Sequence, residues 1–152
     1  AKAMLSVEEV EEDIKTVKPD VVVIDYIQAL KMPKAPNLTE ATNLAIQEIE
    51  RIATENDVIV ILISQLSRAL EARYDKRPIL SDLRNSSVLE ELSDVVIFIH
   101  REDYYTSVID QDERNKAEII VAKNKYGSTG SCTLRCEKGF FTEIQINNII
   151  KL

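Results

Sequence analysis

The chain has 152 residues, of which 45% are hydrophobic and 30% charged, and this composition predicts one globular domain with a substantial core. No apolar run approaches the ~20 residues of a membrane-spanning helix and no signal peptide opens the chain, so we expect a cytoplasmic protein without membrane contact. The net charge of −7 argues against a surface coated for nucleic acid, and any such contact has to be local.

The first predicted element is a helix that ends before Pro19. Ser6 and Glu9 have the spacing of a capping box, in which the two residues satisfy each other's backbone N–H groups. Apolar residues then recur on one helical face. They are Val7, Val10, Ile14 and Val17.

An uninterrupted apolar run, residues 21–24, follows and ends in Asp25. Such a β-branched run predicts a strand buried on both faces, as in a parallel sheet. A carboxylate at its C-terminal end lies where open α/β sheets bind ligands. In nucleotide hydrolases this is the Walker B arrangement, in which the aspartate holds Mg²⁺ beside the phosphates. The alternative is a strand-end aspartate that only caps the next turn.

A helix is predicted over residues 37–56, because apolar side chains recur there at helical spacing. Asn37 or Thr39 can cap its start, and Asn56 can close its end in a left-handed conformation. A helix of this length between two apolar strands predicts a right-handed βαβ unit with parallel strands.

The second strand, residues 58–63, leads directly into Ser64 and Gln65. Parallel strands joined by a helix present their carboxyl ends at one sheet edge, so these side chains are expected near Asp25. A glutamine amide is uncharged and has both donors and an acceptor, which suits it to sense a terminal phosphate or orient a water. The alternative is a loop that happens to begin with two polar residues.

The stretch from Leu66 to Arg84 is polar and locally basic. It holds five basic and three acidic residues, an excess of +2 against the overall −7. A connection this long is usually functional or disordered. Its basic residues are Arg68, Arg73, Lys76, Arg77 and Arg84.

The rest of the chain predicts mostly strands. A short helix is expected over residues 86–92, strands over 94–100 and 117–122, and an antiparallel pair over 131–136 and 140–144. Residues 145–152 are amphipathic and are expected to dock on the core or on a neighbour.

Six short segments follow one another in a distinctive order and spacing. They are Ile24-Asp25-Tyr26-Ile27-Gln28, Ser64-Gln65-Leu66-Ser67-Arg68, Asp75-Lys76-Arg77-Pro78, Ser81-Asp82-Leu83-Arg84, Asp94 to Ile99, and Lys123-Asn124-Lys125. Together they resemble the DnaB-type replicative DNA helicases. The resemblance runs from about Pro19 to Ile144 and falls on the C-terminal part of that family's RecA-like motor domain.

This resemblance implies an α/β fold of the RecA-like P-loop NTPase class. Its core is a mostly parallel sheet with flanking helices, with antiparallel strands near the C-terminus and without the P-loop strand. Residues 1–152 would form one partial motor domain, from the Walker B strand through the C-terminal strands. The complete enzyme would be a hexameric ring that uses ATP and Mg²⁺ to move along single-stranded DNA and unwind the duplex. Its implied partners are the other ring subunits, primase and a helicase loader.

The resemblance also implies roles for individual residues. Asp25 would hold Mg²⁺, with Ser64 and Gln65 at the nucleotide and Gln65 coupling its terminal phosphate to the DNA. Lys123 and Lys125 would reach across the subunit interface to a neighbour's terminal phosphate. The implied DNA-binding residues are Arg68, Arg73, Arg77, Arg84 and Asn85.

The chain departs from the family pattern in several places. The family usually has arginine at the place of Lys125, and lysine keeps the charge but loses the planar fork. It commonly has Glu and Gly where Asn85 and Ser87 stand. No G-x-x-x-x-G-K-[ST] motif occurs among the 152 residues, whose three glycines lie at 127, 130 and 139. We therefore expect this chain alone to be inactive as an ATPase.

Two alternatives remain at this point. A RadA-like recombinase-type ATPase is one, because Lys123 to Gly127 is similar to a signature of that group. A non-catalytic interaction module derived from the motor lobe is the other.

The absent P-loop strand would leave a gap in the sheet. In the family fold it lies between the strand that precedes Ser64 and the strand that follows Asp94. We expect these two strands either to pair directly or to leave edges for self-association, and we favour self-association.

Overall fold

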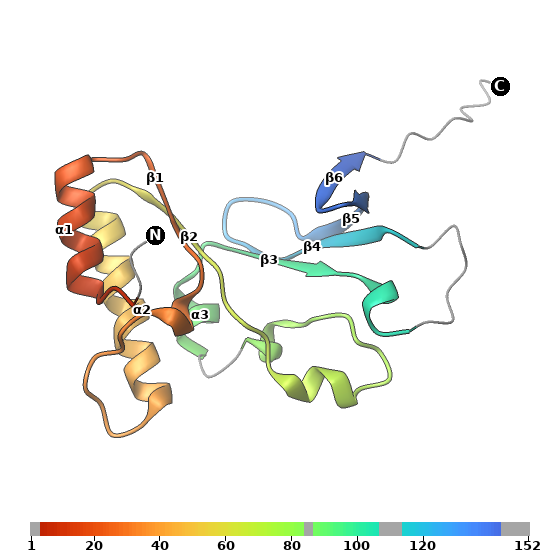
Figure 1. Cartoon of the computed structure of the whole chain (residues 1–152), viewed down its shortest axis with the longest axis horizontal. Coiled ribbons are helices and arrows are strands. Elements are labelled where there is room, and N and C mark those ends of the chain that lie inside the picture. The colour runs from red at the N-terminus through yellow and green to blue at the C-terminus, as the bar shows by residue number, and fades with distance from the viewer. Residues whose placement is uncertain (1–3, 84–86, 107–113, 144–152) are drawn as a thin grey trace. The chain divides into compact units, whose positions relative to one another are not determined.

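The computed structural model describes residues 4–83, 87–106 and 114–143 (Figure 1). The chain divides into two compact units, Ala1–Arg68 with Ser81–Ser93 and Ala69–Leu80 with Asp94–Leu152, called here the first and second units. The described strands form two sheets, a parallel pair in the first unit and a four-stranded antiparallel sheet in the second. That residues 1–152 act as a single domain stays a prediction.

The first unit opens with α1 (Val7–Val17). The predicted capping box is confirmed, since the Glu9 N–H donates to Ser6 Oγ at 3.3 Å and the Ser6 N–H donates to Glu9 Oε2 at 2.8 Å. The helix ends at Lys18, whose left-handed conformation (φ 51°) lets its N–H reach the Ile14 carbonyl. Within the described residues, no helix is long and apolar enough to cross a membrane.

The predicted strand–helix–strand unit is confirmed (Figure 1). It consists of β1 (Val21–Ile24), α2 (Leu38–Glu55) and β2 (Ile59–Leu62). The two strands are parallel, from Val21 opposite Ile59 to Ile24 opposite Leu62.

The two ends of α2 test the cap predictions. Asn37 is the N-cap, and its side chain accepts from the Glu40 N–H at 2.9 Å. The prediction of a left-handed Asn56 is wrong, because its φ is −102° and the positive φ (50°) falls on Asp57. Asn56 instead turns its side-chain amide back to the Ile52 carbonyl at 2.8 Å, and the left-handed residue that closes the helix is Asp57, after which the Val58 N–H donates to the Ala53 carbonyl at 3.0 Å.

The prediction that β1 and β2 are buried on both faces is wrong for the described residues. Their inward side chains join a core with α1, α2 and α3 (Ser87–Leu92). Alternate side chains on the other face are exposed, because in the described residues helices cover only one side of this sheet. The exposed residues are Val21, Val23, Ile59 and Ile61, and we call them the outer face of the parallel sheet.

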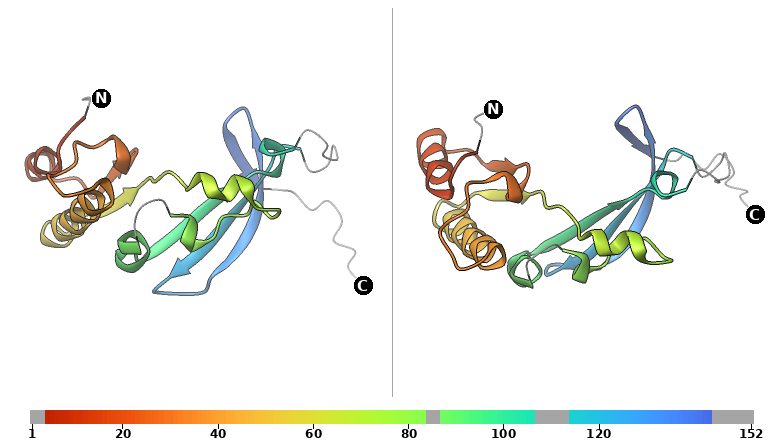
Figure 2. Two further views of the ribbon diagram at one scale, coloured as in Figure 1. Left: turned by 90° about the horizontal axis from the view of Figure 1, so that it is seen from below. Right: turned by 60° about the horizontal axis from the view of Figure 1, so that its bottom comes forward.

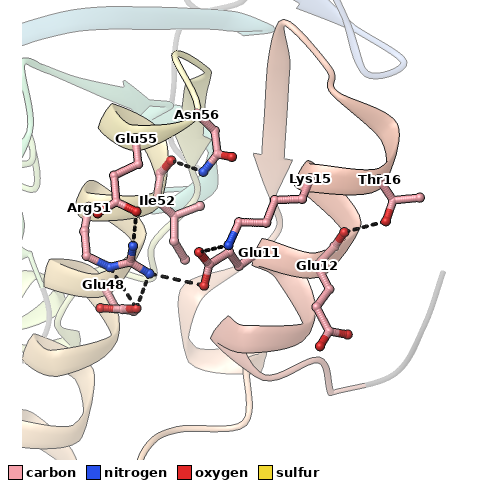
Figure 3. Close-up of polar contacts among 9 residues, drawn as sticks. All are labelled: Glu11, Glu12, Lys15, Thr16, Glu48, Arg51, Ile52, Glu55 and Asn56. Carbon is pink, nitrogen blue, oxygen red and sulfur yellow. Dashed lines mark hydrogen bonds and ion pairs between the residues drawn. The ribbon is translucent and has the colours of Figure 1, made fainter.

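Polar contacts also join α1 to α2 (Figure 3). The Arg51 guanidinium contacts Glu11 at 3.2 Å and Glu48 at 2.6 Å, and it also pairs with Glu55. Lys15 contacts Glu11 at 2.7 Å. These two cations, Lys15 foremost, hold the pKa of Glu11 below its ordinary value. The Arg51–Glu11 contact therefore links two helices whose apolar faces share one core.

The second unit is an antiparallel sheet in the order β3–β4–β5–β6 (Figure 2). The strands are β3 (Val95–His100), β4 (Lys116–Asn124), β5 (Gly130–Glu137) and β6 (Phe140–Glu143). The predicted antiparallel strands near the C-terminus are thus confirmed, while the predicted docking of residues 145–152 lies outside the described residues. In the described part of the chain β2 pairs with β1 and β3 with β4, so direct closure of β2 onto β3 is not seen.

Candidate functional site

The carboxyl ends of β1 and β2 remain hydrogen-bonded to each other beyond the strands. The Ile63 N–H donates to the Ile24 carbonyl at 3.0 Å, and the Ile27 N–H donates to the Ile63 carbonyl at 2.9 Å. Asp25 and Ser64 follow these paired residues directly. The structure therefore brings Asp25 to the same edge of the first unit as Ser64 and Gln65, and Asp25 is exposed there.

The Gln28 side chain organises this edge. Its Nε2 donates to Ser64 Oγ at 3.1 Å, and its Oε1 accepts from the Gln65 N–H at 3.3 Å. Ser64 Oγ in turn lies 3.3 Å from the Gln65 carbonyl oxygen. No role for Gln28 is predicted from the sequence. The available signal was a lone amide between Ile27 and Ala29, three residues after Asp25, where the chain is otherwise apolar.

This edge suits a metal that takes few protein ligands. Within the described ranges there is no group of three or more His, Cys, Asp or Glu side chains that could enclose an ion. Mg²⁺ commonly uses one or two carboxylates and fills its shell with water and substrate phosphate oxygens. A single exposed carboxylate at Asp25 fits that pattern, and it does not fit a closed structural site.

A cavity of about 400 Å³ lies beside the same strand, between α1 and β1. Its lining is mainly apolar, from residues such as Val10, Ile14 and Val22, with Asp13 and Asp25 among its few charged groups. Phosphate groups require N–H donors or cations, which this lining does not concentrate. The cavity is therefore a packing surface beside the site, and the polar chemistry lies with Asp25, Ser64 and Gln65.

The second unit carries the predicted cations at the end of β4. Lys123 lies near the end of the strand, opposite Val96, and Lys125 follows the strand. The Lys125 ammonium contacts Asp94 Oδ1 at 2.9 Å. This hydrogen bond is the main reason why the pKa of Asp94 lies below its ordinary value, and Tyr126 and Lys123 act in the same direction.

The turn after Lys123 is held by Asn124. Its Oδ1 accepts from the Tyr126 N–H at 3.0 Å, and its Nδ2 donates to the Ser128 carbonyl at 3.3 Å. A side chain at Gly127 would approach Asn124 Nδ2 to 3.0 Å, which explains the need for glycine there. The backbone that carries Lys125 is thus fixed on both sides.

Two cations of the basic stretch are directed at its own backbone. Arg73 donates to the carbonyls of Asp75 at 3.3 Å and Arg77 at 2.7 Å. Lys76 donates to the Arg73 carbonyl at 3.0 Å, and Asp75 Oδ1 accepts from the Arg77 N–H at 2.9 Å. These contacts make a closed, self-capped turn out of residues 73–77.

Arg77 attaches this turn to the antiparallel sheet, and in Figure 2 the yellow-green segment that contains the turn lies along that sheet. Its guanidinium makes a two-pronged pair with Glu118 of β4, with Nε to Oε2 at 2.8 Å and Nη2 to Oε1. Ser131 Oγ of β5 donates to the same carboxylate at 2.6 Å. Burial acts to raise the pKa of Glu118, but the bonds from Arg77 and Ser131 outweigh it and leave the pKa below its ordinary value.

The resemblance also implies DNA-binding roles for Arg68, Arg84 and Asn85, which lie outside the turn of residues 73–77. Arg68 is exposed and begins a 3₁₀ helix, Arg68–Ala72. Arg84 and Asn85 lie outside the described residues. The structure thus groups Asp25 with Ser64 and Gln65 in the first unit, and Lys123, Lys125, Arg73 and Arg77 in the second.

Known proteins resemble the chain over most of its length. The family model of the DnaB-like helicase C terminal domain matches residues 1–143. A probable plasmid replicative DNA helicase of Chlamydia psittaci is 42% identical over 117 residues, which are 76% of this chain and 25% of that protein. The replicative DNA helicase DnaB of Geobacillus stearothermophilus is 39% identical over 116 residues, 74% of this chain and 25% of that protein.

Solved structures of a DnaB-like helicase and of an ATPase domain also resemble this chain. A DnaB-like replicative helicase, described with its interactions with primase, superposes with a TM-score of 0.87 at 37% identity, and the match covers 95% of this chain and 37% of that one. A second solved structure, described as an ATPase domain, has a TM-score of 0.86 at 37% identity, over 95% of this chain and 53% of that one. The chain spans about a quarter of the length of the curated relatives it matches, and it belongs to the DnaB-like helicase C-terminal domain family.

Proposed function

We propose that this chain is part of a hexameric replicative DNA helicase, which couples ATP hydrolysis to translocation on single-stranded DNA and to duplex unwinding. The observation that carries the proposal is the first unit's sheet edge, where Asp25 stands beside Ser64 and Gln65 and the Gln28 amide bridges the last two. Replicative helicases among the relatives favour this function over a RadA-like recombinase or a non-catalytic interaction module.

In this proposal the Asp25 carboxylate would hold Mg²⁺ beside the nucleotide phosphates. The metal neutralises charge that develops on the phosphates when it is bound. ATP and Mg²⁺ belong to the complete enzyme. The 152 residues contain no phosphate-binding glycine loop, so the backbone cradle for the phosphates comes from sequence outside them.

Ser64 and Gln65 face the same nucleotide in this proposal. The Gln65 side chain is exposed, while its backbone is bonded to Gln28. A fixed backbone with an exposed amide suits a residue that must respond to the presence or loss of the terminal phosphate. Since Arg68, the first cation of the basic stretch, lies three residues later, a change at Gln65 has a short covalent path to the DNA-binding segment.

Lys123 and Lys125 act on the neighbouring subunit in this proposal. Phosphoryl transfer places negative charge on the phosphate oxygens, and a cation on a firm backbone stabilises it without reorganising. The Asn124 turn supplies that firmness. A ring is then required for turnover, because each site is completed by the next copy of the chain.

DNA binding is assigned to Arg68, Arg73, Arg77, Arg84 and Asn85. Arg77 carries five N–H donors, and the pair with Glu118 engages Nε and Nη2. Half of its side chain is exposed, which supports a phosphate contact alongside the Glu118 pair. Primase and a helicase loader are proposed as further partners of the complete protein, which we expect to be cytoplasmic.

The test is the ATPase and strand-displacement activity of the complete protein that carries this segment. Asp25→Asn and Gln65→Ala should each reduce ATP turnover by at least about a hundredfold, the usual cost of losing a positioned charge-stabilising group. Gln47→Ala, on the exposed face of α2, is the matched control and should change nothing. The 152-residue chain alone should show no turnover. Turnover by this chain that Asp25→Asn abolished would overturn the proposal that it is an incomplete motor.

A further inference from the structure

Asp94 holds Lys125 at two points. The Lys125 N–H donates to the Asp94 carbonyl at 2.9 Å, and the Lys125 ammonium donates to Asp94 Oδ1 at 2.9 Å. The antiparallel register explains the meeting, because Val95 at the start of β3 lies opposite Asn124 at the end of β4. The residues just before and just after these partners are therefore adjacent.

Stability does not account for this contact. The side chains of Asp94 and Lys125 are 55% and 43% exposed, and such surface ion pairs contribute little to stability. The neighbouring strands are already held by their backbone ladder, including the bond from Lys125 to Asp94. The carboxylate is therefore better explained by what it does to the side chain it contacts.

What the contact restrains is a flexible lysine. Lysine carries its charge on a four-carbon stem with about 2 kcal/mol of rotamer entropy, and it lacks arginine's preorganised fork. Held at Oδ1, the ammonium stays at the end of β4, next to Lys123 and Tyr126, which also interact with Asp94.

Resting on the trans role of Lys125 proposed above, we propose that Asp94 is a positioning residue that holds the Lys125 ammonium ready for the neighbouring subunit's terminal phosphate. An exposed pair with one carboxylate is weak enough to exchange. A terminal phosphate brings more charge and three acceptor oxygens, so Lys125 transfers to it when the subunit interface closes. Because Asp94 already restrains the Lys125 side chain, less conformational entropy is lost when the ammonium binds the phosphate.

The first arm of the test needs no catalysis. Carboxyl NMR of the 152-residue chain should show Asp94 titrating below its ordinary range, and Lys125→Ala should move this titration upward. Glu137, which pairs with Arg135 at similar exposure, is the matched reference and should not shift. If the Asp94 titration is unchanged in Lys125→Ala, the contact between Asp94 and Lys125 is absent and the positioning proposal is overturned.

The second arm measures ATP turnover of the complete protein. Asp94→Asn should lower kcat about three- to tenfold with KM for ATP unchanged, the cost of immobilising one flexible side chain. Asp94→Glu should recover most of the loss, and Glu137→Gln should have no effect. The double variant Asp94→Asn/Lys125→Ala should be no slower than Lys125→Ala alone, because Asp94 acts through Lys125.

The outcomes separate the two proposals. Loss of turnover in Lys125→Ala with normal turnover in Asp94→Asn overturns the positioning role and leaves the trans role intact. Additive losses in the double variant also overturn it, because Asp94 would then act independently of Lys125. Normal turnover in Lys125→Ala overturns the trans role and the positioning role together, whatever the NMR arm shows.

Discussion

The Gln28 side chain bonds to both residues that follow Ile63 at the end of β2, accepting from the Gln65 N–H and donating to Ser64 Oγ. One side-chain amide therefore links the segment that follows β1 to the end of β2. Gln28 therefore anchors the residue proposed to sense the phosphate, Gln65, from a position three residues after Asp25, the residue proposed to hold Mg²⁺.

We expect Gln28→Ala in the complete protein to weaken the stimulation of ATP turnover by single-stranded DNA more than it weakens nucleotide binding. The reason is that Gln65 loses its backbone anchor while Asp25 is untouched. The loss should be about three- to tenfold, equivalent to one or two ordinary hydrogen bonds. Measuring turnover with and without DNA checks this, with Gln47→Ala as control. Equal stimulation in the variant and the wild type would contradict a role for Gln28 in coupling.

Glu118→Gln should loosen the turn of residues 73–77 from the sheet. The variant removes the charge that Arg77 pairs with and should cost about 1 kcal/mol locally, since the Arg77 side chain is half exposed. Hydrogen exchange of the Arg77 amide, compared with an amide in the centre of β4, measures the effect. Glu137→Gln provides the control, because its pair with Arg135 does not join two segments. Unchanged exchange of the Arg77 amide would mean that the contacts within residues 73–77 hold the turn without Glu118.

The same pair predicts how acid affects this attachment. The pKa of Glu118 is lowered in the folded chain, so its contribution to stability is complete above the unfolded value of about 4.3. It is lost as the pH falls from there through the lower folded value. The turn should therefore open in acid before the β4–β5 ladder does, and Glu118→Gln should remove that pH dependence. Exchange or proteolysis within residues 73–77 between about pH 5 and pH 3 checks this.

Arg84→Ala in the complete ring should lower the slope of log affinity against log salt for single-stranded DNA by about one unit, because one phosphate contact is lost. Arg135→Ala is the matched control, since Arg135 is an exposed arginine of β5 that pairs with Glu137. An unchanged affinity and slope would reject Arg84 as a phosphate contact.

The outer face of the parallel sheet predicts self-association of the 152-residue chain. Ile59 and Ile61 are 65% and 51% exposed, and β2 pairs on one edge only among the described strands. Ile61→Lys should weaken association about tenfold, the worth of burying one such side chain. Tyr74→Lys, at a fully exposed position of the second unit, should not. Light scattering at several concentrations decides, and a chain that is monomeric throughout would show that the preference for self-association is wrong.

Local signals predicted most of the fold. The Ser6–Glu9 capping box and the Asn37 cap depend on neighbours three residues apart, and they are present as predicted. The end of α2 was mispredicted by one residue, because Asn56 and Asp57 are both able to adopt a positive φ and it is Asp57 that does so.

Tertiary contacts were harder to predict. The apolar run of β1 indicates burial on two faces, but a sequence pattern does not say which residues supply the second layer. Gln28 was missed because its partners are 36 and 37 residues away and an isolated amide has no distinctive spacing. The pairing of Asp94 with Lys125 follows from strand register, which the sequence alone left open.

The antiparallel sheet also has a consequence for the order of folding. Its strands are consecutive along the chain, and the turn at Lys138 and Gly139 joins β5 to β6 directly. The β1–β2 pair instead requires closure of a loop that contains all of α2. Local contacts form faster than distant ones, because less chain entropy is lost before the first contacts are made. The β4–β5–β6 meander should therefore gain exchange protection early, ahead of the β1–β2 pair that carries Asp25 and Gln65.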